Sequence, residues 1–371
     1  MLIGVPKEIK VHEYRVGLTP ESVRELAARG HRVLVQRDAG AGIGATDADY
    51  VAVGGVVVAS AEEIFKQAEM IVKVKEPLAQ ERAWLRAGQA LFTYLHLAAD
   101  AEQTRDLVKS GVVAIAYETV TSPAGGLPLL APMSVVAGRM AVQVAAHFLE
   151  RTHGGRGVLL AGATGVPPGR VLIIGAGVVG SNAALIALGM GAEVVVLSNS
   201  AAPLERLKAE LGPRLKTGLS TPQAIAAELR GADAVIATAM VPGGLAPKLV
   251  TRAMLAGMKQ GAVVVDVSID QGGCFETSRP TTHADPVFTV DGIIHYCVAN
   301  MPGAVPRTST YALNHATLPF VKALADRGIV RALVENEHLR NGLNVAFGKV
   351  TCQPVAEALG YSFAAPETVM G

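Results

Sequence analysis

The sequence predicts an α/β fold with two doubly wound domains, each built around a mainly parallel sheet. Short apolar runs rich in β-branched residues alternate with helical patterns along the chain, which is typical of βα units. These runs fall into two sets, one in each half of the chain. A glycine-rich turn directly follows the first run of the second set, as is typical of a Rossmann-like domain.

The individual elements repeat in the same order in both halves. The first half contains strand-like runs at 2–5, 32–36, 70–74, 90–95 and 112–117. Helical patterns lie between them, each ending near a glycine, at 20–30 and 101–111. The second half contains strand-like runs at 171–175, 193–198, 234–239, 262–268 and 292–298. Each half therefore has enough strands for a sheet of its own.

Two longer helical patterns connect these halves. Residues 131–157 carry apolar side chains at helical spacing over many turns, which predicts a long helix at the domain junction. Residues 308–328 are helical again, and we expect the chain to return there to the first domain. The predicted domains are therefore a discontinuous one, 1–128 plus 307–371, and a continuous dinucleotide-binding one, 129–306.

Composition excludes several classes of protein. Of the 371 residues, 50% are apolar and 18% charged, as in a well-packed globular protein. The net charge of +1 provides no basic field for nucleic acid. The three cysteines form no CxxC pair, and the first residues lack the pattern of a signal peptide. We therefore expect a cytoplasmic protein without disulfides.

One apolar stretch, 171–192, has the length and the lack of charge of a membrane span. Five glycines interrupt it, however, and interior strands of parallel sheets are also continuously apolar. A buried strand, a turn and a helix explain the stretch, so no membrane segment is expected.

Gly175, Gly177 and Gly180 form a GxGxxG turn between an apolar run and a helical pattern. The first glycine permits the tight turn, the second lets the backbone approach a pyrophosphate, and the third lets helix and strand pack closely. The N–H groups at the start of the helix would then face the phosphates. A bare GxGxxG is often only a turn, but strand, turn, helix and strand together predict a dinucleotide site.

The strand after this helix ends at Ser198, where such domains usually carry an acid that binds the ribose 2′-hydroxyl. Ser198, Asn199 and Ser200 offer hydrogen-bond donors and no negative charge. Arg206 and Lys208 follow in the next helical pattern. Either one ribose contact is lost and NAD still binds, or the site tolerates or prefers NADP.

Candidate catalytic groups follow strand-like runs, where ligands gather in open α/β sheets. Lys75 and His96 follow such runs in the first half, Asp270 follows one in the second, and Arg15 lies in "HEYRVGLTP". By pattern alone Lys75 could also be a solvated loop lysine, His96 a core histidine and Asp270 a turn residue. The histidines show no HxxxH or HExxH spacing, and no metal site is predicted.

Longer segments then resemble one family. These are "GVPKEIK" with "E.RVGLTP", "VKVKEPL", "LFTYLHLAAD", "AIAYETV", "LPLLAPMS", "GGRGVLL", "VDVSIDQGGCFETSRPTTH" and "VANMPGAVPRTSTYAL". Together they resemble bacterial alanine dehydrogenases, from Met1 to about residue 360. The resemblance implies two Rossmann-like domains, the first completed by the C-terminal segment, joined by long helices and commonly assembled as a homohexamer.

The resemblance also implies a reaction and a set of residues. The family oxidatively deaminates L-alanine to pyruvate and ammonia with NAD, reversibly. By matching motifs, Arg15 and Lys75 should hold the substrate carboxylate, and His96 and Asp270 should be the acid/base pair. The implied cofactor contacts, together with the turn glycine Gly180 and the strand end Ser198, are Ser134, Gly175, Gly177, Val178, Val179, Ser220, Ala239, Val267, Arg279, Val298 and Asn300.

The chain departs from the family mainly on the ribose side. The family usually has Asp where Ser198 stands and a basic residue where Pro203 stands. Val135 replaces a common Glu, and "GATGVPPG" departs from the usual "GGVPGVxPG". These departures bear on cofactor identity and affinity.

Two related classes are alternatives. The NAD(H)-binding component of proton-translocating transhydrogenase shares the opening motif but generally lacks the "KVKEP" and "YLHLA" patterns that contain Lys75 and His96. A lysine-forming saccharopine dehydrogenase fits "APMSVVAGR" and "VANMPGAVP" poorly. A catalytically silent relative is disfavoured by the intact Arg15, Lys75, His96 and Asp270.

Overall fold

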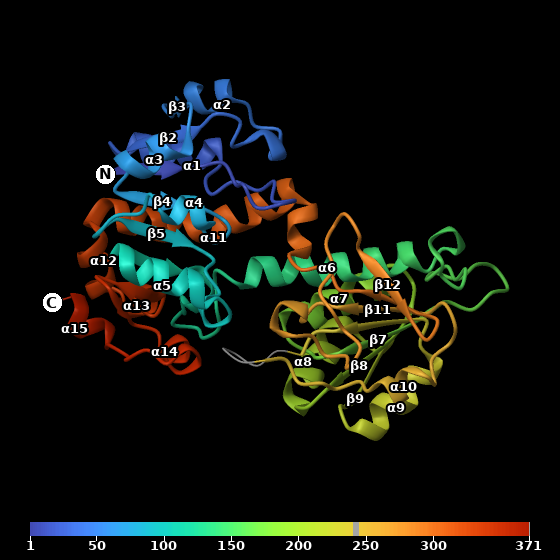
Figure 1. Cartoon of the computed structure of the whole chain (residues 1–371). Helices are drawn as coiled ribbons and strands as arrows, with labels where there is room; N and C mark the ends of the chain where they lie inside the picture. The colour runs from blue at the N-terminus through green and yellow to red at the C-terminus, as the bar shows by residue number, and fades with distance from the viewer. Residues whose placement is uncertain (240–244, 371) are drawn as a thin grey trace. The chain divides into compact units, whose positions relative to one another are not determined.

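Two sheets, one in each of two units, organise the chain (Figure 1). The computed structural model describes residues 1–239 and 245–370. Unit 1 consists of Met1–Met133 and Gly303–Gly371, and unit 2 of Ser134–Pro302. Both sheets are dominated by parallel strands, which confirms the predicted fold class of two Rossmann-like domains.

The sheet of unit 1 has eight strands in the order β15-β14-β6-β5-β4-β1-β2-β3. The six strands from β6 to β3 are parallel, while β14 pairs antiparallel with β6, and β15 with β14. The C-terminal segment thus completes this sheet, as predicted. The strands are β1 (Leu2–Val5), β2 (Arg32–Gln36), β3 (Val56–Val58), β4 (Met70–Val72), β5 (Ala90–Thr93), β6 (Val113–Ala116), β14 (Leu343–Ala346) and β15 (Lys349–Val350).

Helices from both ends of the chain surround this sheet, and Figure 1 shows the red C-terminal helices beside the blue and cyan elements. The N-terminal ones are α1 (Pro20–Ala28), η1 (Ala41–Ile43), α2 (Asp47–Ala52), α3 (Ala61–Gln67), α4 (Ala79–Arg82), η2 (Leu97–Ala99), α5 (Ala101–Ser110) and η3 (Tyr117–Thr119). The C-terminal ones are α11 (Pro306–Arg327), α12 (Ile329–Glu335), α13 (Glu337–Arg340), α14 (Gln353–Leu359) and α15 (Pro366–Met370).

The sheet of unit 2 has seven strands in the order β12-β13-β11-β10-β7-β8-β9. All neighbours are parallel except β12 and β13. The strands are β7 (Arg170–Ile174), β8 (Glu193–Ser198), β9 (Leu215–Leu219), β10 (Ala234–Ala237), β11 (Val263–Asp266), β12 (Val287–Val290) and β13 (Ile293–Tyr296). The helices are η4 (Arg151–His153), α7 (Val178–Gly189), α8 (Ala201–Leu211), α9 (Pro222–Gly231), α10 (Arg252–Leu255) and η5 (Ile269–Gln271), and the boundaries between the units fall within α6 (Ala131–Phe148) and η6 (Met301–Ala304).

The apolar stretch 171–192 forms β7, a turn and α7, as predicted. Strand β7 is buried from Val171 to Ile174 because the sheet is covered on both faces. Within the described ranges, none of the helices combines the length and apolarity needed to cross a membrane.

The predicted helix 131–157 is wrong at its C-terminal end, because α6 stops at Phe148. Glycines cause the stop. Gly154 adopts a left-handed conformation with φ of +86°, and a Cβ on Gly155 would lie 2.2 Å from the carbonyl oxygen of Phe148. The chain therefore turns through η4 instead of continuing the helix. Strands β3, β9, β12, β14 and β15 were not anticipated, because they are short or lack a continuous apolar run.

Candidate active site

Four adjacent parallel strands of unit 1 end at the same edge of their sheet, and charged residues follow each of them. Glu8, Glu13 and Arg15 follow β1, and Lys73 and Lys75 follow β4. His96 follows β5, and Glu118 follows β6. Ligands bind at this edge in open α/β sheets, so the fold gathers the predicted substrate residues of unit 1 where a ligand is expected.

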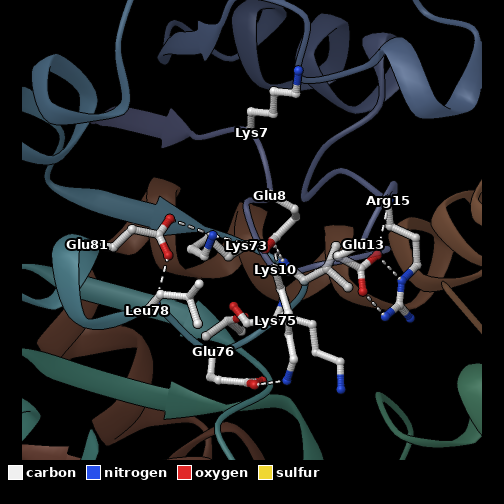
Figure 2. A network of polar contacts seen from close by, with 12 residues as sticks. Lys7, Glu8, Lys10, Glu13, Arg15, Lys73, Lys75, Glu76, Leu78 and Glu81 are labelled. Atoms are coloured by element: carbon white, nitrogen blue, oxygen red, sulfur yellow. Dashed lines mark hydrogen bonds and ion pairs between the residues drawn. The ribbon is translucent and has the colours of Figure 1, made fainter. Parts of the chain in front are cut away.

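Arg15 is buried and forms a two-pronged ion pair with the equally buried Glu13 (Figure 2). Its Nε donates to Oε1 at 2.7 Å and one terminal nitrogen donates to Oε2 at 2.5 Å. The other terminal nitrogen lies 3.0 Å from the sulfur of Met133. Burial works to lower the pKa of Arg15, but the bonds to Glu13 outweigh it and raise the pKa above its usual value. The guanidinium is thus held charged in a fixed plane.

Lys73 is fully buried between two carboxylates (Figure 2). Its ammonium donates to Glu8 at 3.0 Å and to Glu81 at 2.8 Å. Burial lowers the pKa of Lys73, but attraction to both carboxylates exceeds this effect and leaves the pKa raised. Glu8 also accepts the backbone N–H groups of Val74, at 2.7 Å, and Lys75, at 3.3 Å. This cluster therefore fixes the backbone that carries Lys75.

The Lys75 side chain extends away from this cluster in Figure 2. The residue is only 9% exposed, and its carbonyl accepts the Thr93 hydroxyl at 3.0 Å. Among the described residues, its ammonium has no hydrogen bond or ion pair, and the neighbouring Glu76 carboxylate instead binds Lys10. Lys75 and Lys10 together lower the pKa of Glu76 against the opposing effect of burial. Backbone contacts thus hold Lys75 in place, and its role as a binding group stays a prediction.

His96 lies in a left-handed turn, with φ of +52°, and its side chain is 48% exposed. The carboxylate of Glu118 accepts the His96 backbone N–H at 2.6 Å, and it also accepts the N–H of Leu95. The imidazole is parallel to the ring of Tyr94 within 4°, and its Nδ1 lies 3.9 Å from Glu118. Tyr94 is anchored by a 2.5 Å hydrogen bond to the Leu129 carbonyl, and burial raises its pKa. His96 is thus a solvent-accessible imidazole on a fixed turn.

In unit 2 the turn after β7 has the geometry that binds phosphates. Gly175 has a φ of +114°, and a Cβ on Gly180 would lie 1.9 Å from the carbonyl oxygen of Gly175. The Cβ position of Gly177, by contrast, has no atom within 4 Å. Val178 and Val179 begin α7, and their N–H groups lie at its positive end. Open space in front of free helix N–H groups fits a pyrophosphate.

The ends of β8 and β9 lie next to each other beside this turn. Ser198 ends β8, is buried, and accepts the Ser220 backbone N–H on its carbonyl at 2.8 Å. The Ser198 hydroxyl lies 3.4 Å from the N–H of Ser200. Asn199 and Ser200 are exposed. The position usually taken by a ribose-binding acid thus carries no charge.

Asp270 is exposed in η5, directly after β11, and within the described residues its carboxylate has no hydrogen bond or ion pair. The buried Asp266 holds this loop. It accepts the N–H groups of Ser268 at 3.2 Å and Cys274 at 2.7 Å, and the hydroxyl of Ser278 at 2.6 Å. Burial raises the pKa of Asp266, and these hydrogen bonds lower it by less, so the pKa stays above its usual value. Asp266 therefore positions the loop, and Asp270 is the accessible carboxylate.

The remaining predicted cofactor residues, except Ser134, also follow strands of this sheet or lie in the loops after them. Val267 donates its N–H to Ala237 at 3.0 Å, and the carbonyl of Ala239 lies 3.5 Å from the Cys274 sulfur. Arg279 is exposed and stacks on Phe288, 4.1 Å from the ring centroid. The other three are buried or half-buried: Ser134 in α6, and Val298 and Asn300 after β13. Their roles stay predictions.

Sequence reasoning missed the residues that position this site: Glu8, Glu13, Lys73, Tyr94 and Glu118. One signal was present, because Lys73 stands in the otherwise apolar run "MIVKV", where a charge needs buried partners. The partners themselves lie as far as 65 positions away, and no local pattern identifies them.

Two family profiles together match most of the chain. The N-terminal domain of "Alanine dehydrogenase/PNT" matches residues 4–137, and the C-terminal domain of the same family matches residues 141–353. Alanine dehydrogenase of Halomonas elongata is 58% identical over 371 residues and is covered completely, as is this chain. Alanine dehydrogenase of Bacillus subtilis is 50% identical over 371 residues, covering 100% of this chain and 98% of that one.

Two solved structures are also similar to this chain over most of its length. A structure described as L-alanine dehydrogenase superposes with a TM-score of 0.93 at 49% identity, covering 97% of this chain and 99% of that one. A transhydrogenase from Sinorhizobium meliloti superposes with a TM-score of 0.82 at 27% identity, covering 94% and 100%.

Proposed function

Because the chain belongs to the alanine dehydrogenase/PNT family, we propose that it catalyses the reversible, NAD-dependent oxidative deamination of L-alanine to pyruvate and ammonia. The observation that carries this proposal is the set of Arg15, Lys75 and His96 at the carboxyl ends of adjacent strands. Two cations suit a substrate carboxylate, and an accessible imidazole beside them suits proton transfer.

Lys75 and Arg15 bind the substrate carboxylate in this proposal. The Lys75 ammonium forms no ion pair among the described residues, and the nearby Glu76 carboxylate is bound by Lys10, so a substrate carboxylate would give it a direct partner. Arg15 already has Glu13 on one edge, while its other terminal nitrogen faces the sulfur of Met133.

His96 moves the protons. Its neutral imidazole accepts the proton of the substrate ammonium and releases it to solvent, to which the side chain is exposed. It then takes a proton from the water that attacks the imine carbon and returns that proton to the departing amine. Asp270 stabilises the positive charge that develops at the iminium nitrogen. The fixed turn at His96, held by Glu118, limits the positions the imidazole can take.

The cofactor is NAD, and the residues of unit 2 fit it. The open space at Gly177 and the N-terminus of α7 suit the pyrophosphate. When bound, the nicotinamide supplies the hydride acceptor for the substrate Cα. We also propose that NADP is accepted, because Ser198 replaces the acid that would repel a 2′-phosphate.

An assay for alanine-dependent reduction of the nicotinamide tests this function. Purified protein is mixed with L-alanine and NAD or NADP at alkaline pH, which favours oxidation because the reaction releases a proton. We expect absorbance of the reduced nicotinamide to rise only when alanine is present. Absence of this signal with both cofactors would refute the proposal and favour a hydride-transfer component of the transhydrogenase type.

We further propose that the enzyme works in the cytoplasm as a homohexamer. The three thiols are all free, which suits a reducing compartment. The hexamer rests on the family resemblance alone, and light scattering coupled to gel filtration measures it. A mass of one or two chains at assay concentration would rule it out.

A further inference from the structure

Two histidines and a glutamate lie together at the C-terminal end of α6, outside the site described above. The rings of His147 and His153 are 3.8 Å apart between centroids, with 40° between their planes. Their Nδ1 atoms lie 4.0 Å and 3.4 Å from the two carboxylate oxygens of Glu150. One ligand atom from each residue lies within 4.8 Å of the others, and all three residues are exposed enough to admit an ion.

The turn that ends α6 creates this arrangement. An uninterrupted helix would set His147 and His153 about 120° apart around its axis and about 9 Å apart along it. Gly154 and Gly155 instead turn the chain through η4, which brings His153 back against the last turn of α6. Phe148 anchors that turn, because it is buried and packs near Tyr296 at 5.8 Å between centroids. The cluster therefore stands on a fixed base.

We propose that His147, Glu150 and His153 bind a divalent transition-metal ion, with Zn²⁺ as the natural candidate. Two imidazoles and one carboxylate form a ligand set that first-row metals of this kind prefer. Ligand atoms around a tetrahedral Zn²⁺ lie about 3.3 Å apart. The three ligand atoms here lie within 4.8 Å of one another, and the exposed side chains would close this difference by rotation.

The surroundings also favour a cation. The last carbonyl groups of α6 point toward this end of the helix, which is the negative end of its dipole. When Nδ1 of His153 donates to the carbonyl oxygen of His147, at 3.2 Å, the ring is held in place and Nε2 is the nitrogen left to bind the ion. Water would complete the coordination, since three protein ligands leave a fourth position open.

Zinc titration of untagged, chelator-treated protein by calorimetry tests the proposal. We expect one tight site per chain and a melting temperature that rises with Zn²⁺. His147→Ala, Glu150→Gln and His153→Ala should each weaken that site by at least about tenfold. The matched control is His315→Ala, which removes an exposed histidine of α11 and should leave binding unchanged.

Titration with Co²⁺ gives a second readout, because its visible absorption reports the coordination geometry. Absence of a tight site in the unsubstituted protein would overturn the proposal, as would equal affinity in His153→Ala and His315→Ala. Dehydrogenase activity of the metal-free variants should match that of the unsubstituted protein, since none of the three residues belongs to the proposed active site. This test is therefore independent of the proposed function.

Discussion

Glu13 binds Arg15 through two parallel hydrogen bonds, at 2.7 Å and 2.5 Å, although only Tyr14 separates them in the chain. Both side chains are buried. The pair orients the guanidinium before any substrate arrives, which lowers the entropy lost on binding. The predicted substrate arginine is thus part of a preformed ion pair.

Glu13→Ala should destabilise the protein by about 3 kcal/mol, because it leaves a buried guanidinium without its carboxylate. Urea unfolding measures this change, and KM for alanine should rise as Arg15 loses its orientation. The control is Glu62→Ala, which breaks the exposed pair with Lys66 and should cost less than about 1 kcal/mol. If Glu13→Ala and Glu62→Ala lost similar free energies of unfolding, the buried pair would contribute no more to stability than the exposed one.

His96→Gln should lower kcat at least about a hundredfold while leaving NAD binding unchanged, because it removes the proposed proton acceptor. Steady-state kinetics and fluorescence titration with NADH measure the two effects. Full turnover in this variant would remove His96 from the mechanism.

Glu118→Ala should also lower kcat, through loss of the hydrogen bond that holds the His96 backbone. Glu118→Gln keeps an acceptor oxygen and should restore most of the activity. If kcat fell equally in both variants, the negative charge of Glu118, and not its hydrogen bond to the His96 backbone, would be the property that matters.

Lys73→Met should destabilise the protein by about 3–5 kcal/mol at neutral pH, because Glu8 and Glu81 lose the cation between them. The raised pKa of Lys73 fixes the pH dependence. Its stabilisation is fully present below the unfolded pKa of about 10.4 and is lost as pH rises through the higher folded value.

Melting temperatures from pH 8 to above pH 11 check this prediction. The difference between Lys73→Met and the unsubstituted protein should stay constant to about pH 10 and then shrink. Lys66→Met is the control, since Lys66 is exposed and should show little effect at any pH. If the difference in melting temperature grew as pH rose, it would contradict a raised pKa for Lys73.

Three glycines of one turn and helix should respond differently to alanine. Gly180→Ala should cost at least about 2 kcal/mol, because its Cβ would overlap the Gly175 carbonyl. Gly189→Ala has open space in α7 and should be neutral or stabilising by up to about 1 kcal/mol. Gly177→Ala should fold normally but bind NAD more weakly, because its Cβ would occupy the space proposed for the pyrophosphate.

Thermal unfolding and NADH titration of all three variants separate these outcomes. Normal NADH affinity in Gly177→Ala would place the pyrophosphate elsewhere.

Ser198→Asp should shift the cofactor preference toward NADH, because a carboxylate at the end of β8 would bind the ribose hydroxyls and repel a 2′-phosphate. The ratio of kcat/KM for NADH and NADPH measures the shift, and we expect it to rise at least about tenfold. Ser220→Asp, at the end of the neighbouring strand, is the comparison. An unchanged ratio in Ser198→Asp would show that this strand end does not select the cofactor.

The sequence by itself determined the features that depend on short stretches of chain. The apolar runs predicted the main parallel strands, because buried strands need continuous apolar side chains. The GxGxxG pattern predicted a strand, a turn and a helix at Gly175–Gly180, because few residues other than glycine fit that turn. Strand ends also indicated Lys75 and His96, since ligands gather at one edge of such sheets.

The tertiary structure alone decided which distant groups meet. Lys73 meets Glu8 across 65 positions, β14 pairs with β6 across more than 200, and a turn at Gly154 brings His153 onto His147. Backbone preferences act over a few residues, whereas these contacts depend on strand order, on register and on where a helix stops. The physical reason is that a buried charge selects a partner by proximity in space, which only the packed chain defines.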